Sequence, residues 1–409
     1  MKGRLIMNTK HTKATVAVIG CGAFSPFFIP LFKAHPYTEK VYVCDLVPEK
    51  AQTCSEKFGV DIIDTFEEAV SRDDITAVAI FTERHTHGPL VKKALMAGKD
   101  VYSAVPMASD VDECLEIVDA VKKTGLIYMM GETCVYYPCA MFCKKEHKRG
   151  TFGDFVYGES QYFHDLSHFG EKYRNSPDGA GLPPFFYPTH STAMILDAAD
   201  DYVTEVCGFG YKDTNGNEFL KKENNSYGNE FSNEFCMMRL SKGGIARVAE
   251  CRSIGYKAPS SYISGFYGTK GAYQFSNAQH LVTTLTEKGV DLRDVSDEVN
   301  SKATTALKYE LGNSEDFKRQ TANHVNQWRS PSPQQEENYK SIPGEFDGLA
   351  NGHMASHQLL INDFMTAVYE REQPYVDAVR SARYTVPGLI AHKSAMMGSV
   401  NLKVPYIGW

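Results

Sequence analysis

The apolar residues in the first third of the chain fall into short continuous runs. T-V-A-V-I at 15–19, V-Y-V-C at 41–44 and A-V-A-I-F at 77–81 contain no charged position, and amphipathic stretches occupy 47–58 and 88–97. Strands buried on both faces read as continuous apolar runs, and helices between them form crossover connections. The pattern therefore predicts an α/β domain built on a doubly wound parallel sheet.

From about residue 150 the apolar positions alternate with polar ones. The clearest examples are F-C-M-M-R-L at 235–240, I-A-R-V-A-E-C at 245–251 and Y-I-S-G-F-Y-G at 262–268. A period of two is typical of strands with one covered face. We expect a second α/β domain with a large open, mostly antiparallel sheet, and a homo-oligomer formed through that sheet.

A chain of 409 residues exceeds the size at which one core usually keeps growing, so two domains are expected. We place a disordered tail at 1–13, a nucleotide-binding domain at 14–135 and a substrate-binding and oligomerisation domain at 136–409. Polar sequence from about 276 to 345 predicts a long loop, of the kind that often forms a lid or a binding loop. Trp328, inside this insertion, is a candidate for covering a ligand.

Charge and composition exclude several classes of protein. A net charge of −7 argues against a surface for the phosphates of a nucleic acid. No apolar run approaches the roughly 18 residues of a membrane-spanning helix, and the N-terminus lacks the apolar stretch of a secretory signal. Ten cysteines at irregular spacings, with no C-x-x-C pair, predict free thiols in a reduced, cytoplasmic protein.

The first apolar run ends in G-C-G-A-F-S, residues 20–25. Gly20 permits a tight turn, and Gly22 lets the backbone approach a pyrophosphate that also meets helix N-terminal amides. Asp45 lies 23 residues after Gly22, near the interval at which an acid accepts hydrogen bonds from the ribose hydroxyls of a dinucleotide. Ser25 replaces the usual third glycine, which is a mild loss for helix–strand packing. A carboxylate at 45 would repel a 2′-phosphate, so NAD is the predicted cofactor.

The first domain, the segment at 81–108 and I-N-D-F-M-T-A-V at 361–368 together resemble the Gfo/Idh/MocA oxidoreductases. These enzymes pair a Rossmann domain with a C-terminal α/β domain that carries an open sheet. In many members the sequence E-K-P follows the fourth strand, and its lysine helps to handle the proton of the substrate hydroxyl. Here Ala104-Val105-Pro106 stands in that place. Proton transfer must come from elsewhere, or the chain performs no hydride chemistry.

Three observations together suggest which residues bind the cofactor: the glycine turn, the positions of the strand ends and the family resemblance. The expected set is Gly20, Gly22, Ala23, Phe24, Asp45, Thr82, His85, His87, Val105 and Pro106. His87 would either touch the nicotinamide or cap the following helix. Pro106 would fix a turn against the nicotinamide through a cis peptide bond.

F-F-Y-P-T-H-S-T at 185–192 places Tyr187 and His190 three positions apart. It resembles the Y-P-T-H segment of a subgroup that includes NAD-dependent N-acetylgalactosaminidases and sugar or glycoside 3-dehydrogenases. That subgroup tends to lack the lysine, and its tyrosine and histidine line the sugar site. A histidine with a pKa near neutrality can accept a hydroxyl proton, so His190 would be the base and Tyr187 its partner. The alternative is that both residues only cap and pack the helix start.

The other substrate candidates carry imidazole or aromatic groups. They are Tyr136, His164, His168, His357 and Trp328. His164 and His168 flank Asp165 at a spacing that fits a polyol pocket, ordinary surface or a metal site. We assign no metal. His357 is expected to bind a sugar hydroxyl, and Tyr136 either stacks on a sugar ring or belongs to the core.

We therefore expect an enzyme, an NAD-dependent oxidoreductase that oxidises a ring hydroxyl of a sugar or glycoside to a ketone. Carbon 3 is the expected position, and a plant C- or O-glycoside is one possible substrate. One alternative is a glycosidase that uses NAD for oxidation, elimination and re-reduction. The absent lysine motivates another, a non-catalytic sensor of NAD and sugar. The expected partner is a small molecule, with neither nucleic acid nor membrane involved.

Overall fold

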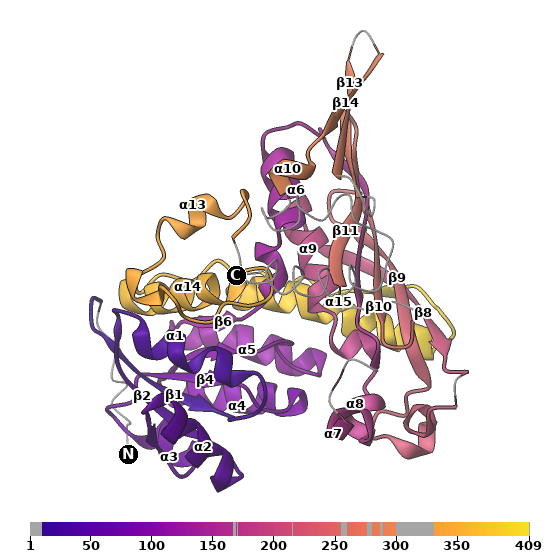
Figure 1. Ribbon diagram of the computed structural model, residues 1–409. Coiled ribbons are helices and arrows are strands. Elements are labelled where there is room, and N and C mark those ends of the chain that lie inside the picture. The colour runs from indigo at the N-terminus through magenta and orange to yellow at the C-terminus, as the bar shows by residue number, and fades with distance from the viewer. Residues whose placement is uncertain are drawn as a thin grey trace, which may run out of the picture. The chain divides into compact units, whose positions relative to one another are not determined.

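The structure, a computed structural model, describes residues 10–166, 169, 171–214, 216–254, 260–275, 280–286, 289–299 and 331–408. These residues form two compact units. Unit 1 contains the described residues up to Thr133, Glu336–Ala382 and the last two described residues, and unit 2 contains those of Cys134–Gln335 and Arg383–Tyr406. Among the described residues no helix is long and apolar enough to cross a membrane. Figure 1 shows the elements of both units, coloured along the chain.

Unit 1 is built on a sheet of six parallel strands over its described residues. Their order is β3-β2-β1-β4-β5-β6, which confirms the doubly wound sheet predicted from the sequence. The strands are β1 (Ala14–Ile19), β2 (Thr38–Cys44), β3 (Asp61–Ile62), β4 (Ala77–Ile80), β5 (Asp100–Ser103) and β6 (Tyr128–Met130). Every residue of β1 and β4 is buried, as their continuous apolar runs require. The strand order reverses between β1 and β4, and dinucleotides bind at the carboxyl ends of strands at such a point.

Helices connect and cover this sheet. They are α1 (Ile29–Ala34), α2 (Pro48–Phe58), α3 (Phe66–Ser71), α4 (Arg84–Met96), α5 (Val111–Thr124), α13 (Glu336–Tyr339), α14 (Ser356–Glu370) and the start of α15 (Ala378–Met396). Helix α14 packs against α1 and also contacts β1. The ring of Phe364 on α14 lies 6.3 Å from that of Phe32 and 5.6 Å from that of Tyr102. These contacts place Glu336–Ala382 in unit 1, whereas we had assigned it to the second domain.

Unit 2 contains a nine-stranded sheet over its described residues. The strand order is β14-β13-β12-β11-β7-β10-β9-β8-β15, and only β7 and β10 pair in parallel. The strands are β7 (Phe155–Phe163), β8 (Val203–Lys212), β9 (Phe231–Leu240), β10 (Ile245–Cys251), β11 (Ser260–Gly268), β12 (Gly271–Phe275), β13 (His280–Thr286), β14 (Gly289–Asp294) and β15 (Leu402–Lys403). This confirms the predicted large, mostly antiparallel sheet.

One face of this sheet is covered by helices. The helices of unit 2 are α6 (Pro138–Lys148), α7 (Glu171–Arg174), α8 (Pro177–Ala180), α9 (Thr189–Ala199), α10 (Ser296–Val299) and the end of α15. Helix α9 packs against α6 and contacts β7, β10 and β11. All of its residues are buried, so its first turn lies inside unit 2.

The polar insertion expected as a loop at about 276–345 is partly a β-hairpin. Strands β13 and β14 pair with each other, and β13 also pairs with β12 (Figure 1). Strand pairing uses backbone groups, so polar side chains at a sheet edge do not prevent it. The expectation of a loop was therefore wrong for these two strands. Trp328 lies outside the described residues.

His35, which follows α1 in unit 1, is held as a neutral imidazole. Its Nδ1 accepts a hydrogen bond from the backbone N–H of Tyr37 at 3.2 Å, so the proton is on Nε2, 3.3 Å from Asn362 Oδ1. Burial lowers the pKa of His35 to about 4 from an ordinary value of 6.5. A histidine with a lowered pKa contributes stability that is complete above pH 6.5 and is lost as the pH falls towards 4. Burial also raises the pKa of Asp363 to about 7, which opposes this trend by favouring the folded protein at lower pH.

We expect single substitutions to separate these two contributions. In Asp363→Asn only His35 still makes stability depend on pH in this range. When the pH is lowered from 7 to 4, the free energy of unfolding of this variant should therefore drop by about 3 kcal/mol more than that of the wild type. In His35→Gln only the Asp363 carboxyl still contributes to the pH dependence. The free energy of unfolding of this variant should therefore rise relative to the wild type as the pH falls over this interval. Urea unfolding at both pH values measures the difference. Unchanged pH dependence in both variants would contradict this interpretation.

Candidate active site

The turn after β1 is shaped by Gly20. Its N–H donates to the Cys44 carbonyl at 2.8 Å, and its φ of +95° lies in the left-handed region. A Cβ at this position would lie 2.6 Å from the Phe81 carbonyl oxygen at the end of β4. Glycine is therefore required both by the backbone conformation and by the close approach of the neighbouring strand.

Gly22 and Asp45 provide features that fit a dinucleotide. A Cβ added to Gly22 would meet nothing within 4 Å, so the backbone there faces open space that a pyrophosphate could enter. Asp45 Oδ2 accepts from the Cys21 N–H at 2.7 Å, and Oδ1 accepts from the Val47 N–H at 2.8 Å. Each carboxylate oxygen can accept a further hydrogen bond, as recognition of ribose hydroxyls requires. These residues fit the predicted cofactor, with Ser25 buried beside them.

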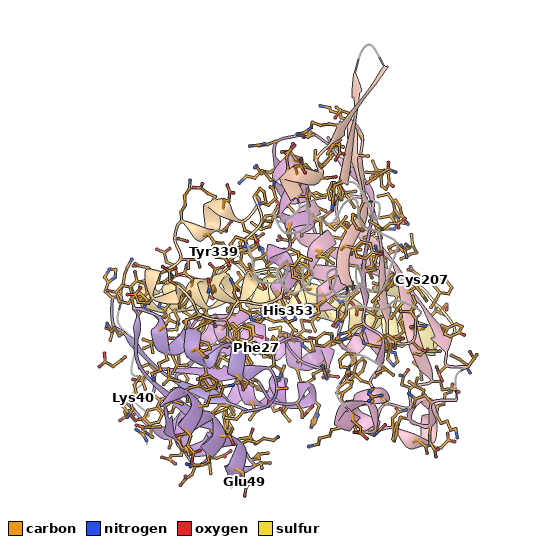
Figure 2. All side chains as sticks on the ribbon, in the orientation of Figure 1. Phe27, Lys40, Glu49, Cys207, Tyr339 and His353 are labelled. Atoms are coloured by element: carbon orange, nitrogen blue, oxygen red, sulfur yellow. The ribbon has the colours of Figure 1, made fainter. Side chains whose placement is uncertain are left out.

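Removing the charge of Asp45 should weaken the preference for NAD over NADP. In Asp45→Asn the repulsion of a 2′-phosphate is lost, and one acceptor for the ribose is lost with it. We expect the ratio of the NADP and NAD dissociation constants to fall at least about tenfold, equivalent to roughly 1.4 kcal/mol. Titration calorimetry with both nucleotides measures this ratio. The matched control is Glu49→Gln, which removes an exposed charge from α2 (Figure 2); an equal effect there would contradict a specific role for Asp45.

The remaining cofactor candidates lie at the ends of β4 and β5. His87 on α4 is buried, with Nδ1 2.7 Å from the Pro106 carbonyl oxygen and Nε2 3.1 Å from the Thr82 carbonyl oxygen. Burial lowers the pKa of His87, and because both neighbouring oxygens are acceptors, the neutral ring can donate a hydrogen bond to only one of them. Val105 is buried and its peptide bond to Pro106 is cis, whereas His85 is exposed on α4. The contact of His87 with the nicotinamide stays a prediction.

Phe24 and His357 meet behind the glycine turn, while Ala23 is exposed. The Phe24 ring stands edge-on to the His353 and His357 rings at 5.6 and 5.7 Å, and His357 packs 4.4 Å from Phe28. His353 Nδ1 lies 2.8 Å from His357 Nε2, in the region where Figure 2 labels His353 and Phe27.

His357 lies inside unit 1. Its ring is 1% exposed, and burial followed by repulsion from His353 lowers its pKa well below the ordinary value. The ring packs among aromatic residues of unit 1, and its role in binding a sugar hydroxyl stays a prediction. The more exposed His353 has a φ of 47°, and the two residues after it are also left-handed, which is costly for non-glycine residues.

Unit 2 brings Tyr187 and His190 together. Tyr187 precedes α9 and His190 is the second residue of that helix. Their ring centroids are 5.0 Å apart, edge to face, and the His190 side chain is 4% exposed. The Tyr162 ring of β7 lies 4.9 Å from His190, also edge-on. The imidazole is thus enclosed by two tyrosines, one of which the sequence analysis had missed.

Two further residues at this site were also missed. The Arg252 guanidinium lies 4.9 Å from the centre of the Tyr162 ring and 5.8 Å from that of Tyr187. Arg252 Nη2 donates to Glu250 Oε2 at 3.1 Å, and both side chains are buried. Burial raises the pKa of Tyr162 well above its ordinary value, so its hydroxyl keeps its proton. The available signal was the charged pair Glu250 and Arg252 at the end of the segment A-R-V-A-E-C-R at 246–252, directly after the apolar residues Val248 and Ala249.

The other substrate candidates have separate environments. His164 Nδ1 is hydrogen-bonded to the Tyr162 hydroxyl, and its ring stacks on Phe169 at 3.9 Å. Asp165 Oδ2 accepts from the Ile254 N–H at 2.9 Å. Tyr136, in the 3-10 helix Thr133–Tyr136, is 6% exposed, and its stacking on a sugar ring stays a prediction. His168 lies outside the described residues.

The sheet order, glycine turn and carboxylate define a dinucleotide-binding α/β protein. Comparison with known families gives a match between residues 14–132 and a model described as "Oxidoreductase family, NAD-binding Rossmann fold", which represents Gfo/Idh/MocA. Residues 14–132 therefore belong to the Gfo/Idh/MocA oxidoreductase family, as the sequence resemblance predicted, and they form its NAD-binding domain. NAD is the cofactor of this domain.

Similar proteins include two named for glycoside hydrolysis. "Glycosyl hydrolase family 109 protein 3" of Phocaeicola vulgatus is 25% identical over 64% of this chain and 53% of its own length. "Alpha-N-acetylgalactosaminidase" of Bacteroides fragilis is 36% identical over 32% of this chain and 33% of its own length. The chain thus spans about half or less of the length of these relatives.

A solved structure shares the fold over both units. It is a levoglucosan dehydrogenase in complex with NADH and levoglucosan, with a TM-score of 0.72 and 17% sequence identity. The alignment covers 97% of this chain and 100% of that protein. At this identity the likeness establishes the fold.

Proposed function

We propose that the protein is an NAD-dependent dehydrogenase that oxidises a ring hydroxyl of a sugar or glycoside, at carbon 3, to a ketone. The observation that carries the proposal is the His190 imidazole enclosed by Tyr162 and Tyr187 in a protein whose other unit binds NAD. Such a ring can accept a proton without the lysine that many relatives use. The sugar dehydrogenase that shares the fold supports the same class of substrate.

Oxidation of a carbinol removes one hydrogen as a proton from the oxygen and one as a hydride from the carbon, and each residue of the site has a separate role in this reaction. His190 accepts the hydroxyl proton, and the oxygen becomes the carbonyl oxygen of the product. Tyr187 donates a hydrogen bond to that oxygen and limits where the hydroxyl can lie. Tyr162 packs edge-on against the His190 imidazole and so fixes the orientation of that ring. When bound, NAD supplies the acceptor for the hydride that leaves the same carbon.

A glycosidase that uses NAD catalytically is the second candidate, and the names of the two relatives favour it. Oxidation at carbon 3 acidifies the hydrogen on carbon 2, which permits loss of the leaving group, addition of water and return of the hydride. The first proton transfer, to His190, is shared by both functions. Only the glycosidase needs a second base near carbon 2.

One assay separates these functions. The protein with NAD is incubated with a panel of sugars and glycosides, while NADH absorbance is followed and products are analysed by chromatography. Accumulating NADH with a keto sugar or keto glycoside supports the dehydrogenase. Released aglycone without net NADH supports the glycosidase. If no sugar in the panel gives either product, the proposal of an enzyme fails in favour of an NAD and sugar sensor.

We further propose that the uncovered face of the unit 2 sheet binds a second copy of the chain. Phe209 and Tyr211 on β8 and Met237 on β9 are exposed, and Cys207 pairs in register with Met237 on the adjacent strand. A sheet face carrying apolar side chains is typical of a subunit interface. Light scattering should give more than one monomer mass, and Phe209→Glu should lower it. A monomeric wild type would contradict this proposal.

A further inference from the structure

The segment that carries Tyr187 and His190 is anchored at its start by a buried carboxylate. Glu234 on β9 is 0% exposed, and its Oε2 accepts from the backbone N–H of Phe185 at 2.7 Å. Its Oε1 lies 2.7 Å from Nδ1 of His392 on α15. Helix α15 also leaves no room at Gly388, where a Cβ would lie 2.2 Å from Pro188. The chain on the N-terminal side of Tyr187 and His190 is therefore tightly constrained.

A second buried carboxylate anchors the other end. Glu250 on β10 is 0% exposed, and its Oε1 accepts from the Ser191 hydroxyl in the first turn of α9. Its Oε2 accepts from Arg252, whose guanidinium lies against the rings of Tyr162 and Tyr187. The Glu250–Arg252 ion pair thus contacts the residue after His190 and both tyrosines beside it.

Burying an ion pair in a protein interior has a large desolvation free energy. Removing two charges from water costs more than packing apolar residues of the same volume, so a buried pair is weak evidence for a role in stability. Arginine offers a planar surface that lies flat against aromatic rings, which lysine cannot provide. This desolvation cost has a functional explanation if the Glu250–Arg252 pair fixes the orientation of Ser191 and of the two tyrosine rings.

We propose that Glu250 and Arg252 are positioning residues, which hold Tyr187 and the His190 imidazole in the arrangement required for proton transfer. This inference rests on the proposed function, because it assigns the two residues to the same reaction. Glu250 acts on the first turn of α9 through Ser191, and Arg252 acts on Tyr187 through its ring. Neither residue transfers the proton itself.

Kinetics of Glu250→Gln and Arg252→Lys test the proposal. The first keeps the shape of the side chain but leaves the Arg252 charge without its carboxylate, and the second keeps the charge but not the planar surface. Because small displacements of a reacting group can reduce turnover by about 10²-fold, we expect kcat to fall by that order in both, with KM for the sugar nearly unchanged. The matched control is Glu146→Gln, which alters a buried carboxylate of unit 2 that is paired with Arg149. Wild-type kcat in both variants would overturn the proposal.

A measurement without turnover keeps this inference separate from the proposed function. Edge-on packing against two tyrosines should displace the imidazole C–H resonances of His190 through ring currents, and these resonances can be assigned by their loss in His190→Gln. We expect Glu250→Gln to move them towards the values of free histidine, and Glu146→Gln to leave them in place. If Glu250→Gln does not fold, Ser191→Ala removes the hydroxyl that joins α9 to Glu250, together with its 3.1 Å contact to the Pro188 carbonyl oxygen, and should give the same displacement. Unmoved resonances would refute the positioning role even in an active enzyme, whereas moved resonances in a protein that oxidises no sugar would refute the proposed function alone.

Discussion

Replacement of His190 by alanine is expected to lower kcat by about 10²–10⁴-fold, the usual contribution of a general base. The affinity for NAD should stay within error of the wild type, because the residues predicted to bind the cofactor all belong to unit 1. Initial rates of NADH formation and calorimetric titration with NAD measure the two quantities. Tyr187→Phe should have a smaller effect on kcat, since it removes a hydrogen bond and leaves the base in place.

The control for this experiment is His147→Asn, which removes a histidine of unit 2 that packs against Phe266. Its kcat should be close to that of the wild type. Full turnover in His190→Ala would eliminate the assignment of the base while leaving the fold and the cofactor unaffected. A loss of NAD binding in the same variant would instead indicate that the substitution disturbs the whole protein.

Alanine substitutions at the two glycines of the turn are expected to affect different properties: stability at Gly20 and NAD binding at Gly22. Gly20→Ala forces a side chain into a backbone conformation with φ of +95° and against the Phe81 carbonyl oxygen, so the free energy of unfolding should fall by at least about 2 kcal/mol. Gly22→Ala meets no atom within 4 Å and should leave stability unchanged. Its methyl group would occupy the space that a pyrophosphate needs, so the dissociation constant for NAD should rise at least about tenfold.

Urea unfolding without nucleotide and calorimetric titration with NAD test both variants side by side. Each variant serves as the control for the other, since both add one methyl group within the same turn. A Gly22→Ala protein that binds NAD normally would show that the cofactor does not approach this backbone. A Gly20→Ala protein of normal stability would contradict the close approach of Gly20 to the Phe81 carbonyl oxygen.

The sequence predicted those features that depend on local pattern. Continuous apolar runs indicated buried parallel strands, and the residues just after them had to lie at the carboxyl edge of the sheet. For this reason Gly20, Gly22 and Asp45 could be placed near the ends of β1 and β2 from the sequence. Tyr187 and His190 were found through resemblance to a short motif, and their spacing of three was enough to bring the rings together.

Features that depend on contacts between distant segments were not predictable in this way. Nothing local indicates that α14 returns to unit 1, because that placement results from Phe364 packing on Phe32 and Tyr102. Tyr162 contacts His190, and Glu250 and Arg252 contact the residues next to it, only because β7 and β10 are neighbouring strands that both contact α9. The β13–β14 hairpin was missed because an edge strand can form from polar residues when its backbone is paired.

The most direct test of the account follows the hydrogen that leaves the sugar. The protein is mixed with NAD and a sugar that carries deuterium on carbon 3, the reaction is quenched within one turnover, and the recovered nicotinamide is examined by mass spectrometry. The account predicts deuterium in the nicotinamide ring, and much less of it when His190 is alanine. A wild-type protein that binds both compounds yet returns nicotinamide free of deuterium would contradict it.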